Sequence, residues 1–288
     1  MEHSPTLATS PATTAMVAPR IVQMRAPNAD EWTYGGTNTW LLAAESNDRC
    51  VVVDPGVADK KYLEFLQQEA ESRGWSVTGV LLTHGHEDHS DGARELAVAT
   101  ASPVLGASRQ FADVLIGEGT NLAEYGGSGV VLHTPGHSDD SICIDLDGKY
   151  LVTGDTLLGG HSSGVFGDFR EYLRSIERLL SFTEGRGIAG LPGHGTFIAD
   201  AHSALERLLA ARLRKIEQVR SAIAASPTLS AMQLVAQIYP SVTQFHQPSA
   251  ALMIVGIARH LLDADREATP QARSAYHRLT AEVVQEHE

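Results

Sequence analysis

The feature that most constrains this chain is a cluster of imidazole and carboxylate side chains at residues 83–89, which read Thr-His-Gly-His-Glu-Asp-His. The cluster follows an apolar run at residues 77–82, which predicts a β-strand. One short loop at the end of that strand therefore offers His84, His86, Asp88 and His89 as ligands. Neutral imidazole and carboxylate suit Zn²⁺ and comparable divalent ions, so the cluster indicates a metal site.

Three further candidate ligands each follow a predicted strand: His137, Asp155 and His194. Each stands beside a glycine or proline, which allows the backbone to turn sharply and direct the side chain into a shared cleft. A solvent-exposed polar loop would explain residues 83–89 alone, but it would not explain three more ligand types at equivalent places. The sequence therefore predicts one metal-binding cleft built from several strand ends.

Apolar periodicity predicts a mixed α/β fold for the first two thirds of the chain. Strand-like runs at residues 20–25, 39–43, 50–53 and 77–82 alternate with helical patterns at 59–73 and 91–98. Hairpin-like runs at 130–132, 141–146 and 149–153 follow, and then a helical pattern at 169–182. We expect two sheets packed face to face with helices outside, which is a four-layer αββα sandwich.

The ends of the chain differ from this central part. Residues 1–20 are rich in Ser, Thr, Pro and Ala and lack a basic start followed by an apolar block, so they predict a disordered tail rather than a signal peptide. Residues 21–200 form the predicted catalytic domain, and residues 201–288 a small helical domain. No run approaches the roughly 20 apolar residues of a membrane span. Cys50 and Cys143 lie in apolar runs and predict buried thiols, which favours the cytoplasm.

The complete pattern His-x-His-x-Asp-His, His, Asp, His resembles that of the metallo-β-lactamase fold superfamily over about residues 20–200. The resemblance implies that His84, His86 and His137 hold one metal ion, that Asp88, His89 and His194 hold a second, and that Asp155 bridges both. The motifs at residues 36–40, 134–140 and 191–195 look like those of the lactamase-beta-like protein 2 group, which implies a winged-helix-like C-terminal domain.

This ligand set implies hydrolytic chemistry. Two divalent ions, with zinc as the default and iron or manganese as alternatives, would share a bridging hydroxide near neutral pH. Asp88 would orient that nucleophile. Asp54 is expected either to orient a metal ligand through a hydrogen bond or to serve only as a turn residue before Pro55. His161 follows Asp155 closely enough to line the cleft.

Two substrate classes remain open. Asp155 stands where the true β-lactamases carry cysteine, which disfavours antibiotic hydrolysis. Hydrolysis of a small ester or thioester, in the manner of glyoxalase II, suits the net charge of −13, because tight binding to a polyphosphate needs a basic face. The alternative is single-strand endoribonuclease activity, supported by a basic strip in the helical pattern at 200–225: Arg207, Arg212, Arg214, Lys215 and Arg220.

Overall fold

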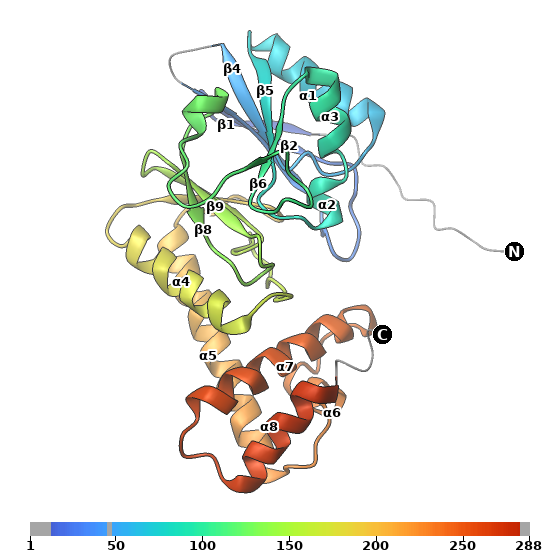
Figure 1. Ribbon diagram of the computed structural model, residues 1–288, viewed down its shortest axis with the longest axis vertical. Coiled ribbons are helices and arrows are strands. Elements are labelled where there is room, and N and C mark those ends of the chain that lie inside the picture. The colour runs from blue at the N-terminus through green and yellow to red at the C-terminus, as the bar shows by residue number, and fades with distance from the viewer. Residues whose placement is uncertain (1–12, 45–47, 283–288) are drawn as a thin grey trace, which may run out of the picture. The chain divides into compact units, whose positions relative to one another are not determined.

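The computed structural model describes residues 13–44 and 48–282, which fall into two compact units (Figure 1). The first unit comprises Met1–Thr134, Asp140–His161 and Gly185–Ala201. The second comprises Pro135–Asp139, Ser162–Glu184 and His202–Glu288. The chain thus passes between the units several times, and the division into domains at residue 200 stays a prediction.

The first unit contains a seven-stranded sheet whose strands lie in chain order. Neighbours are antiparallel as far as β4 and parallel from β4 onward. The strands are β1 (Thr14–Ala18), β2 (Ile21–Arg25), β3 (Asn38–Ala43), β4 (Arg49–Val53), β5 (Ser76–Leu81), β6 (Val104–Gly106) and β7 (Val114–Leu115).

Strand β1 corrects part of the predicted disordered tail. Thr14–Ala18 pairs with β2 as the edge of the sheet, whereas residues 1–12 lie outside the described residues. The strand is largely exposed, so its sequence lacks the alternation of apolar and polar residues that marks a half-buried strand. The strand is held in place by its pairing with β2, and the composition of residues 14–18 does not reveal that pairing.

A four-stranded sheet completes the β-structure of the first unit, in the order β11-β10-β9-β8. Strands β8 to β10 are antiparallel, and β10 and β11 are parallel. The bounds are β8 (Val130–His133), β9 (Ile142–Leu146), β10 (Tyr150–Gly154) and β11 (Ala189–Pro192).

Alternate side chains of the first sheet belong to two different hydrophobic cores. Val51 and Val53 of β4 pack with Val131 and Ile144 of the second sheet. Residues on the other face pack against α1 (Lys60–Ser72) and α3 (Ala93–Thr100), whose apolar positions include Leu66 and Leu96. This division follows from the two-residue period of a strand. Two sheets flanked by helices confirm the predicted αββα architecture.

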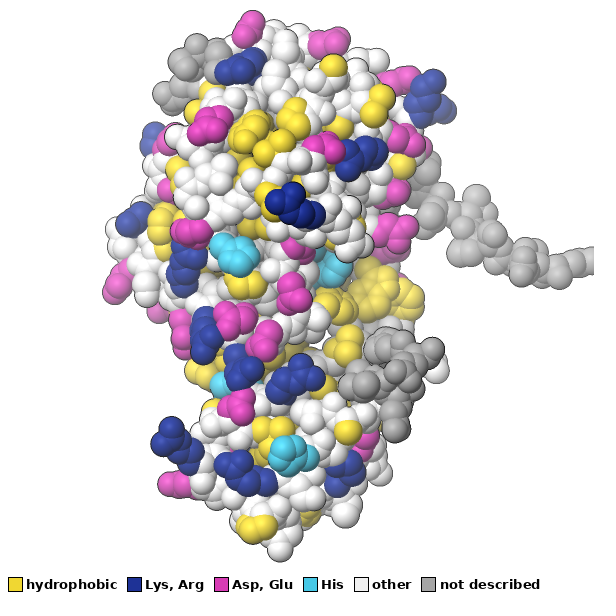
Figure 2. Space-filling model, viewed as in Figure 1, with side chains coloured by type: hydrophobic (Ala, Val, Ile, Leu, Met, Phe, Trp, Pro, Cys, Tyr) yellow, Lys and Arg dark blue, Asp and Glu magenta, His cyan; other side chains and the backbone are white. Residues whose placement is uncertain are grey.

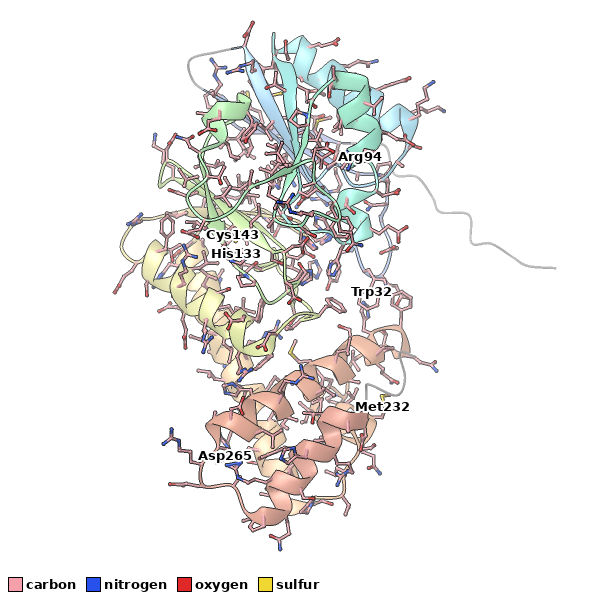
Figure 3. All side chains as sticks on the ribbon, in the orientation of Figure 1. Trp32, Arg94, His133, Cys143, Met232 and Asp265 are labelled. Atoms are coloured by element: carbon pink, nitrogen blue, oxygen red, sulfur yellow. The ribbon has the colours of Figure 1, made fainter. Side chains whose placement is uncertain are left out.

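Both cysteines are buried and not disulfide-bonded, as the sequence predicts. Cys50 lies in β4, where burial raises the pKa of its thiol to about 12. Cys143 lies in β9 (Figure 3). None of the described helices combines the length and apolar character that crossing a bilayer requires.

The second unit is helical, and α7 packs against α4, α6 and α8. The helices are α4 (Phe169–Thr183), α5 (Ala201–Ala225), α6 (Ala231–Ile238), α7 (Gln247–Ala264) and α8 (Pro270–Glu282). The predicted C-terminal helices are thereby confirmed. The stretch from residue 202 to residue 282 contains no strand, so no β-hairpin wing is formed there.

Candidate metal centre

The candidate ligands of the first unit stand where strands end. Asp54 follows β4, the loop with His84 follows β5, Asp155 follows β10 and His194 follows β11. Strands β4 and β5 are parallel, as are β10 and β11, so each pair delivers its C-terminal ends to the same edge of its sheet. The short helix α2 (Glu87–Ser90) carries Asp88 and His89 back to this edge.

Two overlapping groups of potential ligands form at this edge. The ligand atoms of His84, His89 and Asp155 lie within 4.8 Å of one another, as do those of Asp88, His89 and His194. His89 Nε2 is 3.1 Å from His194 Nε2, and Asp88 Oδ2 is 3.0 Å from His194 Nε2. His86 joins through its Nδ1, 3.0 Å from His84 Nε2. The structure therefore brings six of the predicted ligands together within the first unit.

His137, the remaining predicted ligand, belongs to the second unit. It is buried, and its Nδ1 lies 3.0 Å from the backbone oxygen of Gly164 and 3.2 Å from Ser163 Oγ. The backbone oxygen of His137 accepts a hydrogen bond of 2.8 Å from the Phe166 N–H. These contacts hold both ring and backbone, and its place among the metal ligands stays a prediction.

Asp54 orients His89 through a direct hydrogen bond. Its Oδ2 is 2.9 Å from His89 Nδ1, and the carboxylate also accepts bonds of 2.8 and 2.7 Å from Thr83 N and Oγ1. A ring that donates from Nδ1 presents the lone pair of Nε2, and His89 Nε2 is the nitrogen that faces His194. Asp54 also adopts a left-handed φ of 51°, a strained conformation typical of functional sites. The orienting role is therefore favoured over a plain turn.

Negative charge is concentrated around a fully buried imidazole. Complete burial by itself lowers the pKa of His89, but Asp155, Asp54 and Asp88 together raise it well above its ordinary value. Burial opposes ionisation of Asp88, yet His89 and His194 hold the pKa of its carboxyl below the usual range. Three carboxylates around facing ring nitrogens call for a cation, and this donor set fits a divalent metal ion.

The loop that carries His194 is packed too closely for any side chain at residue 193. A Cβ on Gly193 would overlap Asp155 Oδ1 and would lie 2.8 Å from His89 Cε1. Asn38, fully buried in β3, holds the same loop by donating to the backbone oxygens of Pro192 and Gly195 at 2.9 and 3.1 Å. The sequence analysis did not predict this role of Asn38. A polar asparagine at the first position of a buried apolar strand could have indicated it.

Aromatic rings flank the ligand group in the first unit. Tyr34 stacks on His161 with ring centroids 3.6 Å apart and an interplanar angle of 12°, and its edge faces the His194 ring at 6.3 Å. Tyr34 has a left-handed φ of 56°. Burial, together with the charge of Asp155, raises the pKa of the Tyr34 hydroxyl. His161 is exposed, and its place in the cleft stays a prediction, whereas His133 is an exposed residue ending β8 (Figure 3).

Comparison with known proteins connects this geometry with a superfamily. Residues 32–110 match the family model of the metallo-beta-lactamase superfamily. An atrochrysone carboxyl ACP thioesterase from Claviceps purpurea is 29% identical over 217 residues, which cover 72% of this chain and 66% of that protein. A second one, from Pseudocercospora fijiensis, is 29% identical, with 62% of its length covered. The chain thus spans slightly less than two thirds of these two relatives.

Other matches extend over nearly the whole chain. The beta-lactamase-like protein 2 homolog of Drosophila melanogaster is 27% identical, with 91% of this chain and 92% of that protein covered. A metallo-beta-lactamase family protein from Thermus thermophilus has the same fold, with a TM-score of 0.71 at 19% identity over 89% of this chain and 98% of that one. In its fold, and over residues 32–110 in its sequence, the chain is therefore similar to proteins of the metallo-β-lactamase superfamily.

Proposed function

We propose that the chain is a dinuclear metal-dependent hydrolase that cleaves a small ester or thioester. In this proposal one ion, zinc by default and iron or manganese as alternatives, is held by three imidazoles, and the other by two imidazoles and a carboxylate. Two bound ions lower the pKa of water and polarise a substrate carbonyl. His84, His86 and His137 would hold the first ion, Asp88, His89 and His194 would hold the second, and Asp155 would contribute to both sites.

Asp88 is the proposed catalytic residue. Its side chain is 29% exposed, whereas that of His89 beside it is 0% exposed, so Asp88 is the carboxylate of the second group that solvent and substrate can reach. An ionised carboxylate accepts a hydrogen bond from an attacking water and thereby orients it. Asp54 performs no such step, because its oxygens are occupied by Thr83 and His89.

The observation that carries the substrate class is the stacked pair of Tyr34 and His161 beside His194. A substrate at His194 would meet aromatic surface, which suits an apolar acyl group better than a chain of phosphates. The thioesterase names of the fungal relatives point to the same bond type. Removal of the ring in Tyr34→Ala should raise KM for a thioester by roughly fivefold, or about 1 kcal/mol, whereas Tyr34→Phe should leave KM unchanged. Steady-state kinetics with both variants test this.

The residues that favoured RNA are largely engaged within the second unit. Arg212 is buried, Lys215 Nζ donates 2.7 Å to the backbone oxygen of Ile238, and Arg220 pairs with Glu217 and Asp265. Asp265 is labelled in Figure 3. On the face drawn in Figure 2, Lys and Arg side chains stand among Asp and Glu rather than forming a basic track. These contacts favour a small substrate over single-stranded RNA.

The decisive experiment offers the metal-loaded full chain a panel of acyl thioesters and a labelled single-stranded RNA. We expect thioester turnover that a chelator abolishes and that Asp88→Ala reduces to background. Glu87→Ala is the matched control, because Glu87 is the neighbouring acidic residue on the same helix. Chelator-sensitive RNA cleavage without thioester turnover would overturn the proposal.

A further inference from the structure

Arg212 occupies a buried position on α5, where the sequence predicted a member of a basic strip. The buried positions of this helix include Leu205, Ile216 and Val219, and Arg212 lies on the same helical face, with only 4% of its surface exposed. Leu213, which the apolar pattern would place on the buried face, is instead 52% exposed. The second unit therefore buries a guanidinium where a leucine was available one residue away.

This guanidinium is held without a negative partner. The described residues place no carboxylate oxygen within 4.0 Å of it, and its Nε has no hydrogen-bond partner among them. Nη2 donates 2.6 Å to the backbone oxygen of Ser163, and the guanidinium lies over the Tyr172 ring, 5.4 Å from its centroid. Burying an arginine without an ion pair costs free energy. This cost points to a role for the contact with Ser163.

Ser163 connects Arg212 with His137 inside the second unit. Ser163 Oγ is 3.2 Å from His137 Nδ1 and donates 2.9 Å to the backbone oxygen of Gly164. That same oxygen is 3.0 Å from His137 Nδ1 and can accept its proton. Tyr172, under the guanidinium, also supports the His137 loop, because a Cβ on Gly136 would overlap the Tyr172 backbone nitrogen. Arg212 thus touches both supports of His137.

We propose that Arg212 is a positioning residue for His137. By fixing the backbone oxygen of Ser163, it keeps the Gly164 oxygen opposite His137 Nδ1, so the ring donates from Nδ1 and presents Nε2 as the metal-binding nitrogen. Helix α5 thereby contributes to metal binding although it carries no ligand. The inference rests on the proposed function only in taking His137 as a metal ligand.

Cobalt(II) binding to the metal-free full chain, followed by titration calorimetry and the visible spectrum of the ion, tests this role. We expect Arg212→Met to weaken one of two cobalt sites by about tenfold and to shift its spectrum, leaving the other site unchanged. Arg212→Lys, which keeps a charged donor, should fall between wild type and Arg212→Met. Arg220→Met is the matched control, because Arg220 lies on the same helix and makes half-exposed ion pairs.

A double-mutant cycle separates positioning from general loosening of the fold. In a His137→Ala background, Arg212→Met should cause no further loss of cobalt affinity. Equal weakening of both sites, or the same loss with and without His137, would overturn the inference. If Arg212→Met does not fold, Arg212→Lys is measured in the same cycle, with the same two readings. Wild-type protein that binds fewer than two cobalt ions would instead contradict the proposed dinuclear site.

Discussion

His89 in the first unit and His137 in the second are oriented by different means. Both rings are held at Nδ1, at 2.9 Å by the Asp54 carboxylate and at 3.0 Å by the Gly164 backbone oxygen. Asp54 is fixed within the first unit by Thr83, which lies just beyond the end of the neighbouring parallel strand β5. The Gly164 oxygen belongs to a loop, and that loop depends on Arg212 from a helix far along the chain.

The two rings differ in which substitutions should disturb their orientation. A hydrogen bond to an ionised carboxylate is roughly twice as strong as one between neutral groups, so the device at His89 is strong and local. The hydrogen bond between His137 Nδ1 and the Gly164 oxygen is weaker, and it depends on the contacts of Arg212 elsewhere in the second unit. Substitutions in the second unit should therefore weaken binding of the ion proposed at His137 and leave binding of the ion proposed at His89 unaffected.

The largest effect is expected for Asp54→Ala. The change removes the acceptor of His89 Nδ1 and also leaves two buried donors of Thr83 without their partner. Metal affinity should fall about 100-fold, the upper range for loss of a residue that orients a ligand. Titration calorimetry with zinc measures it, and Asp113→Ala, an exposed ion-pair residue, serves as the control. A smaller loss of metal affinity in Asp54→Ala than in Arg212→Met would show that the hydrogen bond to Asp54 is not the stronger of the two.

Gly193→Ala is expected to lower the free energy of unfolding by about 2 kcal/mol, because the added Cβ would clash with Asp155 and His89. Urea unfolding of metal-free protein measures this loss. Gly117→Ala provides the matched control, since a Cβ there has no neighbour within 4 Å. Equal stability of the two variants would show that Asp155 and His89 move aside easily, which would contradict the close packing at Gly193.

A smaller effect should follow from loss of the helix cap at the start of α4. Asp168 accepts hydrogen bonds from the backbone N–H groups of Arg170 and Glu171, and Asp168→Ala should cost about 1 kcal/mol. Asp168→Asn retains a capping oxygen and should be nearly neutral. Because α4 carries Tyr172, the alanine variant should weaken the ion at His137 slightly. If binding of the ion proposed at His89 weakened by the same factor, the two ways of orienting a histidine would not differ as argued.

The sequence predicted most of the helices and strands, and it did so for a physical reason. The candidate ligands Asp155 and His194 are marked by turn residues at strand ends, and the parallel pairing of β10 and β11 brings those two ends together. The αββα architecture followed from apolar runs and their periods. These are local signals that a single chain displays directly.

Other features depend on partners distant in sequence and could not be predicted. Asp54 was balanced between two roles because its bond to His89 spans 35 residues. Arg212 looked like part of a basic strip because a charged side chain normally faces water, and its contacts with Ser163 and Tyr172 are not visible in the sequence. Strand β1 has no apolar alternation, so only its pairing with β2 reveals it.

The most direct test of the account is the number of metal ions bound per chain, measured by elemental analysis of wild type and His137→Ala after equilibration with zinc. We expect two ions in the wild type and one in the variant, because His137 is proposed to serve only one of the two sites. A single ion in the wild type, or two ions retained in His137→Ala, would contradict it.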